Sequence, residues 1–75
     1  MVFEKLVDII ADTLNVSKDE LKMETSLKDD LQADSLDVVE IIMEIENEFG
    51  IAIDDDAALN FATIADVVGY IENNQ

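Results

Sequence analysis

Ser35 is the residue with the clearest potential for chemistry, because Asp34-Ser35-Leu36 closes a loop and opens an acidic, amphipathic helix. The chain contains no His and no Cys, which excludes the Ser-His-Asp and Cys-His arrangements of nucleophilic catalysis. A serine hydroxyl without a base is a weak nucleophile. It is well placed to receive a group that another protein attaches, although a structural role beside an Asp cap is the commoner explanation for these three residues alone.

Other motifs that carry chemistry are absent from the sequence. No Gly-x-Ser-x-Gly turn surrounds Ser35, and no glycine-rich phosphate loop occurs. The run Asp54-Asp55-Asp56 lacks the alternating acids, central Gly and distal Glu of a calcium loop, so helix capping explains it better, with weak divalent binding as a minor addition. We therefore predict no catalytic residue, no metal site and no enzymatic activity.

Hydrophobic spacing predicts helices at both ends of the chain. Apolar residues recur at helical spacing over residues 2–14 and over residues 64–72. Thr63, followed by Asp66, has the pattern of a capping box at the start of the last helix. The buried stripe of that helix is predicted to consist of Ile64, Val67, Val68 and Ile71.

Two further helices are predicted between them. Asp34 is the expected N-cap of a long helix that runs to about Phe49, where Gly50 ends it in a left-handed conformation. Residues 51–53 form an extended link, and a short helix follows over roughly 56–61. Its cap is one of three consecutive aspartates, Asp54, Asp55 or Asp56.

The segment between the first and second long helices is mostly loop. Ser17, with Glu20 after it, predicts a capping box that starts a turn or two of helix. The spacing of Leu27 and Leu31 predicts a further helical turn inside the loop. We therefore expect one domain over residues 1–75, an all-α bundle of three main helices and one short helix with a long first loop.

The long helix that begins after Asp34 carries two apolar stripes. At about 100° per residue, one face has the spacing of an ordinary core stripe, formed by Val38, Ile41, Ile42, Ile45 and Phe49. Leu36, Val39 and Met43 fall on roughly the opposite face. Because a helix in a small bundle buries one face, this second stripe is predicted to be exposed, either as scattered surface residues or as a docking face bordered by acids.

Charge is distributed unevenly along the chain. The 75 residues carry a net charge of −15, and residues 29–75 hold 13 acidic residues and no Lys or Arg. Such a field repels nucleic acid and anionic membranes and attracts basic protein surfaces. No apolar run is long enough to span a membrane, and the absence of Cys fits a reducing compartment. We predict a cytoplasmic monomer that docks basic proteins and does not bind nucleic acid or insert into membranes.

The segment from Leu31 to Phe49 closely resembles the acyl carrier proteins of bacterial type II fatty acid synthesis. The family has Leu-Gly-Ala-Asp-Ser-Leu-Asp there, followed by an apolar and acidic helix that ends Glu-Glu-Glu-Phe. The similarity extends over nearly the whole chain and includes Thr63-Ile64 and Tyr70-Ile71. The resemblance implies a four-helix bundle and a carrier function.

The resemblance marks Ser35 as the residue that receives 4′-phosphopantetheine from coenzyme A through a phosphopantetheinyl transferase. The thiol of this arm then carries acyl groups as thioesters. Basic patches of the transferase and of fatty acid synthase enzymes would meet a partner face that consists of Asp34, Leu36, Asp37, Val39, Glu40, Met43, Glu44, Glu46 and Glu48. Growing acyl chains would fold back into a pocket lined by Ile42, Ile45, Ile53, Ala58 and Phe61.

Three departures from the family pattern have consequences. Gln32 stands where the family usually has Gly, so a positive φ there costs about 1 kcal/mol or more unless the loop is reshaped. Asn47 replaces one of the usual acids. Phe61 replaces a branched aliphatic residue and is expected to narrow the acyl pocket, while Leu59-Asn60 replaces a charged pair.

Two kinds of alternative remain open from the sequence. A polyketide or D-alanyl carrier protein belongs to the same class and would use the same serine. An acidic adaptor that is never modified would use the same helix face and would need no chemistry at Ser35. Replacement of Ser35 by Ala separates the classes, because a carrier loses its function and an adaptor keeps its partner.

Overall fold

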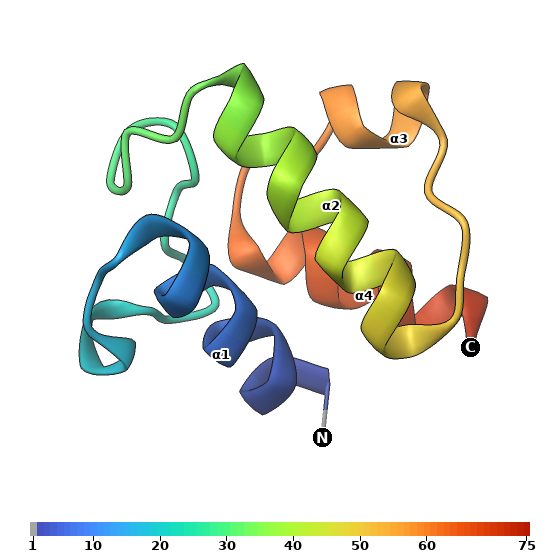
Figure 1. The fold of residues 1–75 in the computed structure, drawn as a ribbon, viewed down its shortest axis with the longest axis horizontal. Coiled ribbons are helices and arrows are strands. Elements are labelled where there is room, and N and C mark those ends of the chain that lie inside the picture. The colour runs from blue at the N-terminus through green and yellow to red at the C-terminus, as the bar shows by residue number, and fades with distance from the viewer. Residues whose placement is uncertain (1) are drawn as a thin grey trace.

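The computed structural model describes residues 2–75, which form four α-helices and one 3₁₀ turn (Figure 1). In chain order these are α1 (Val2–Leu14), the turn η1 (Lys18–Glu20), α2 (Ser35–Phe49), α3 (Asp55–Leu59) and α4 (Ile64–Asn74). No strand forms within these residues, which confirms the predicted all-α bundle of three main helices and one short helix with a long first loop. In Figure 1, α2 crosses the middle of the molecule, with α1 on one side and α3 on the other.

The start of α2 is fixed by a capping box between Asp34 and Asp37. Asp34 Oδ1 accepts a hydrogen bond of 2.9 Å from the Asp37 N–H, and Asp37 Oδ2 accepts one of 3.4 Å from the Asp34 N–H. The helix ends at Gly50, which has φ 65° and ψ 36° and donates its N–H to the Glu46 carbonyl at 2.9 Å. Both ends of α2 lie where the local sequence predicts them.

A second capping box begins α4. Thr63 Oγ1 accepts from the Asp66 N–H at 3.4 Å, and Asp66 Oδ2 accepts from the Thr63 N–H at 3.1 Å. The helix continues to Asn74, beyond the predicted end at about Glu72. Its predicted core stripe is confirmed, because the buried residues of α4 are Ile64, Val67, Val68 and Ile71.

The turn after α1 differs from the predicted capping box. Ser17 Oγ accepts from the Asp19 N–H at 3.3 Å rather than from Glu20, and the predicted turn or two of helix is a single 3₁₀ turn. The chain leaves this turn at Leu21, whose N–H donates to the Lys18 carbonyl at 3.1 Å and whose side chain is buried. Burial of Leu21 therefore ends the turn before a longer helix can form.

The third helix begins and ends earlier than the predicted range 56–61. Asp54 occupies its N-cap position without a side-chain capping bond, which leaves Asp55 and Asp56 in the first turn, where acids favour the positive end of the helix. Phe61 lies outside the helix and is buried. Its packing into the core draws the chain away from the helix axis after Leu59.

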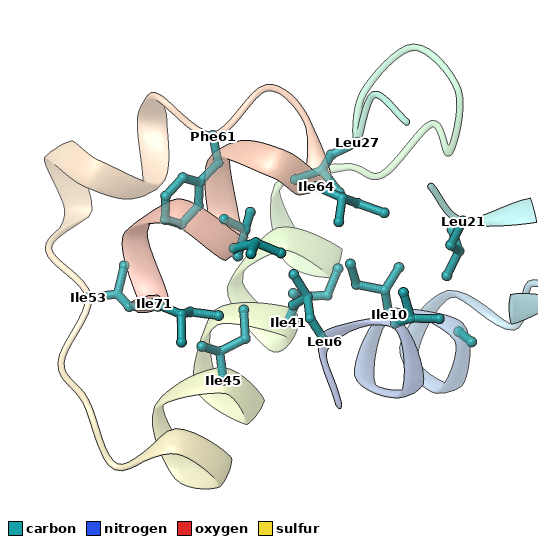
Figure 2. Packing of buried hydrophobic residues seen from close by; sticks show 14 residues of the cluster. Leu6, Ile10, Leu21, Leu27, Ile41, Ile45, Ile53, Phe61, Ile64 and Ile71 are labelled. Atoms are coloured by element: carbon teal, nitrogen blue, oxygen red, sulfur yellow. The ribbon is translucent and has the colours of Figure 1, made fainter. Parts of the chain in front are cut away.

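The core lies between α1, α2 and α4, and α1 packs against both of the other two helices. Figure 2 shows Ile53 and Phe61 on the side of the cluster next to α3, and Ile10 and Leu21 on the opposite side. Leu6, Ile10, Ile45, Ile64 and Ile71 have no exposed surface. Among residues 2–75 no helix is both long and apolar enough to cross a membrane.

The long loop is held against the starts of α2 and α4. The Leu27 N–H donates to the Ala62 carbonyl at 2.9 Å, and the Leu27 carbonyl accepts from the Ala33 N–H at 3.0 Å. The predicted helical turn between Leu27 and Leu31 is present, because the N–H groups of Asp30 and Leu31 both donate to the Ser26 carbonyl at 3.1 Å. Leu27 therefore joins the loop to the segments that lead into α2 and α4.

Candidate functional site

Ser35 is the first residue of α2, and its side chain is exposed. The other two serines of the chain have structural roles, since Ser17 Oγ accepts from Asp19 and Ser26 Oγ accepts from the Asp29 N–H at 3.0 Å. The Ser35 hydroxyl makes no hydrogen bond within residues 2–75. Asp34 supplies the cap, so Ser35 is not needed to start the helix.

The backbone around Ser35 favours an anion. The capping bond from Asp34 satisfies the Asp37 N–H, and the Val38 N–H donates to the Asp34 carbonyl at 3.0 Å. The N–H groups of Ser35 and Leu36 have no acceptor in the described part of the chain. Free N–H groups at the positive end of a helix attract a negatively charged group, so an anion attached to this hydroxyl would be stabilised.

A hollow of about 670 Å³ opens beside Ser35. Its walls come from the long loop, from α2 and from α3 with its flanking residues, and most of them are apolar. The apolar lining residues are Leu27, Ala33, Val38, Val39, Ile42, Met43, Ile53, Ala58, Leu59 and Phe61. The polar lining residues are Lys28, Asp34, Ser35, Glu46 and Asp55.

Four of the five residues predicted for the acyl pocket line this hollow, namely Ile42, Ile53, Ala58 and Phe61. Ile45 does not line it, because its side chain is fully buried among core residues that include Ile71 (Figure 2). The Phe61 ring meets the Tyr70 ring edge-on, with centroids 5.6 Å apart and an interplanar angle of 73°. This contact holds Phe61 as one wall of the hollow.

The second apolar stripe of α2 is exposed, as helical spacing predicts. Leu36 is 74% exposed, Met43 is 60% exposed and Val39 is 50% exposed. Leu59 of α3, at 81%, is more exposed than any of them and lines the same hollow as Val39 and Met43. Sequence reasoning missed Leu59 as a site residue, although its replacement of a charged family residue was a signal for it.

The acidic residues predicted for the partner face do not share one environment. Asp34 and Asp37 form the capping box, and the Glu46 carboxylate accepts a hydrogen bond of 2.8 Å from the Ile53 N–H. Glu40, Glu44 and Glu48 are exposed. Glu44 and Glu48 line a different hollow of about 610 Å³ against α1, together with the ion pair Asp8–Lys18.

That ion pair is separate from the residues around Ser35. Lys18 Nζ lies 2.7 Å from Asp8 Oδ1, and this hydrogen bond raises the pKa of Lys18 above its ordinary value. Residues 2–75 contain no group of three or more His, Cys, Asp or Glu side chains arranged to hold a metal ion. The three consecutive aspartates occupy the N-cap and the first turn of α3.

Comparisons with known proteins agree with this geometry. The family described as "Phosphopantetheine attachment site" matches residues 4–71. The acyl carrier protein of Clostridium acetobutylicum is 54% identical over 72 residues, which are 96% of this chain and 94% of that protein. The match covers Ser35 and both helices that border the hollow.

Two solved structures have the same fold. A Mycobacterium tuberculosis protein assigned as an acyl carrier protein superposes with a TM-score of 0.91 at 32% identity and covers 97% of each chain. The acyl carrier protein of Enterococcus faecalis has a TM-score of 0.84 at 36% identity, over 99% of this chain and 94% of that one. This chain therefore belongs to the acyl carrier proteins, whose domain carries a covalently attached phosphopantetheine group.

Proposed function

We propose that the phosphopantetheine group is attached to Ser35 Oγ as a phosphodiester and that this carrier serves fatty acid synthesis. The observation that supports the attachment residue is the exposed hydroxyl of Ser35, which makes no hydrogen bond within residues 2–75, at the start of a helix that Asp34 already caps. A phosphodiester fits this position, because the free N–H groups of Ser35 and Leu36 at the positive end of α2 would stabilise its negative charge. When bound, the arm supplies a thiol, the only one in this Cys-free protein, on which acyl groups are held as thioesters.

We propose that the hollow beside Ser35 shelters the acyl chain. Ile42, Ile53, Ala58 and Phe61 supply apolar walls, and burial of an aliphatic chain against them is favourable at about 0.8 kcal/mol per methylene. Ile45 supports the wall from the core rather than touching the chain. The hollow would also keep water from the thioester.

The partner face is proposed to dock basic patches of phosphopantetheinyl transferase and of fatty acid synthase enzymes. Its apolar centre consists of Leu36, Val39 and Met43, with Leu59 beside them on α3. The acidic rim steers a basic surface toward it. Exposed Glu40, Glu44 and Glu48 are free to pair with cations, whereas Asp34, Asp37 and Glu46 also hold the fold.

The proposal also covers domain organisation, oligomeric state, catalysis and location. We propose that residues 1–75 act as one carrier domain, as a monomer, and that the chain itself catalyses no reaction. The absence of Cys supports a cytoplasmic location, where fatty acid synthase enzymes would meet it.

Intact mass tests the attachment residue. The apo protein is incubated with coenzyme A and a broad-specificity phosphopantetheinyl transferase, beside Ser35→Ala and Ser17→Ala variants. We expect a gain of one phosphopantetheinyl unit in the wild type and in Ser17→Ala, and none in Ser35→Ala. A folded wild-type protein that gains no mass would instead leave the acidic adaptor as the better explanation.

A second measurement tests the pathway. The loaded protein is offered malonyl coenzyme A with a fatty acid synthase malonyl transferase, and separately D-alanine and ATP with a D-alanyl ligase. A malonyl mass increment alone supports fatty acid synthesis or a related polyketide route, and chain extension by fatty acid synthase condensing enzymes separates the two. A D-alanyl increment alone would overturn the fatty acid assignment.

A further inference from the structure

Lys28 is the last basic residue of the chain, and none of the 47 residues that follow it is Lys or Arg. It is exposed and lines the hollow beside Ser35, where it is the only cation among the lining residues. The ion pair formed within residues 2–75 joins Lys18 to Asp8, so Lys28 has no carboxylate partner there. The Lys28 ammonium group is therefore free to pair with an anion added beside Ser35.

The backbone that carries Lys28 is firmly held. The Ser26 N–H donates to Asp30 Oδ2 at 2.8 Å, and Ser26 Oγ accepts from the Asp29 N–H, so two reciprocal bonds close the turn that contains Lys28. Leu27, its neighbour, is buried. The Leu27 carbonyl accepts the Ala33 N–H at 3.0 Å, which fixes this turn against the segment that leads directly into Ser35.

A phosphodiester on Ser35 adds negative charge beside Asp34 and Asp55, which line the hollow, and beside Asp37 in the first turn of α2. The helix N-terminus offsets part of this repulsion, and a nearby ammonium group would offset more of it. Lys28 is the cation that the fold places on the same hollow.

We propose that the Lys28 ammonium pairs with the phosphodiester on Ser35 and thereby holds the base of the arm over the mouth of the hollow. Lys28 is then a positioning residue, which acts on where the arm lies and not on any bond that is made or broken. The inference rests on the proposed attachment at Ser35. It goes further by giving a role to a loop residue that lies outside both α2 and the partner face.

The first test is phosphorus NMR of the loaded protein. Wild type, Lys28→Met, Lys28→Arg and Lys22→Met are compared, where Lys22 is an exposed loop lysine that does not line the hollow. We expect the phosphodiester resonance of the wild type, Lys28→Arg and Lys22→Met to shift as salt is raised to about 0.5 M, because salt screens the pair. The resonance of Lys28→Met should start at the high-salt position and lose this dependence.

The second test locates the arm directly. Because the chain has no Cys, a maleimide nitroxide reacts only with the thiol of the arm. We expect paramagnetic broadening of the amides of Ile42, Ile53 and Ala58 in the wild type and Lys28→Arg, and reduced broadening in Lys28→Met. Lys22→Met should match the wild type.

The outcomes separate this inference from the proposed function. Intact mass shows whether each variant is loaded, and loading of Lys28→Met at Ser35 leaves the attachment assignment in place. Phosphorus spectra and broadening that are the same in Lys28→Met and the wild type would overturn the role of Lys28 alone. A wild-type protein that is not loaded at all would overturn the proposed function as well.

Discussion

The Glu46 carboxylate accepts a hydrogen bond of 2.8 Å from the Ile53 N–H and so ties the last part of α2 to the link that leads into α3. Both residues line the hollow beside Ser35. On the other side of the link, the Tyr70 hydroxyl donates to the Ala52 carbonyl at 3.3 Å. The wall that α3 gives to the hollow is therefore held through the link by one side chain of α2 and one of α4.

Loss of the Glu46 carboxylate should loosen this wall. We expect Glu46→Ala to lower the free energy of unfolding by about 1–2 kcal/mol, because a half-buried backbone N–H loses its charged acceptor. Glu46→Gln keeps an acceptor oxygen and should lose less. Glu44→Ala is the matched control, because it removes the same charge from the same helix at an exposed side chain. Equal urea unfolding curves for Glu46→Ala and Glu44→Ala would contradict the structural role.

Gln32 adopts φ 53°, a left-handed conformation, so the loop is not reshaped to avoid the strain that its side chain causes. Gln32→Gly should raise the free energy of unfolding by about 1 kcal/mol. Glycine relieves the strain of the left-handed conformation, and this gain is larger than the entropy that glycine adds to the unfolded chain. Asn15 at φ 61° provides the comparison, because Asn tolerates this conformation better than Gln. We expect a smaller gain for Asn15→Gly. A Gln32→Gly protein no more stable than the wild type in urea would show that the strain does not exceed the entropy cost of glycine.

Phe61 lines both the hollow beside Ser35 and a shallower one of about 420 Å³ against α4. Phe61→Ile should therefore deepen the acyl hollow toward α4, at a cost of about 1–2 kcal/mol in stability from lost packing. The measurement is the rate at which hydroxylamine cleaves acyl thioesters of increasing length. Dodecanoyl thioesters should be cleaved more slowly in Phe61→Ile than in the wild type, and butyryl thioesters at similar rates. Equal protection of long chains in both proteins would refute the prediction.

The pKa of Asp66 lies below its ordinary value of 3.8, because the N–H groups of Ala62 and Thr63 donate to its carboxylate. A lowered folded-state pKa means that this carboxylate stabilises the fold above the ordinary value and that the contribution is lost as the pH falls below it. Asp66→Asn should therefore be less stable than the wild type near neutral pH, with the difference shrinking as the pH falls below the ordinary value of 3.8. The measurement is the melting temperature of the wild type and of Asp66→Asn as a function of pH.

Asp56→Asn is the control for Asp66→Asn, because it removes one exposed charge from the first turn of the neighbouring helix without removing a capping bond. Its difference from the wild type combines the relief of repulsion in a protein of net charge −15 with the loss of one favourable charge at a helix start, and Asp66→Asn shares both effects. If the two variants follow the same pH profile, the Asp66 capping bonds contribute nothing measurable.

Helix ends were predictable wherever a cap lies within a few residues of the helix it serves. The boxes Asp34–Asp37 and Thr63–Asp66 link residues three apart, so the chain carries the whole signal locally. The short elements were predicted less well. The turn at Ser17 and the limits of α3 depend on burial of Leu21 and Phe61, which is a property of the core and not of the neighbouring residues.

The sequence by itself determined the helices, the two stripes of α2, the charge asymmetry and the serine that begins α2, because helical periodicity and capping act within one segment. Tertiary structure alone decided which side chains meet around that serine. Leu27, Ile53 and Phe61 come from three separate segments, and only packing brings them to one hollow. The same packing brings the Glu46 carboxylate to the Ile53 N–H, leaves Leu59 exposed and places Lys28 beside the hollow. These three positions depend on how the long loop and the helices are fixed against one another, which no single segment of the sequence determines.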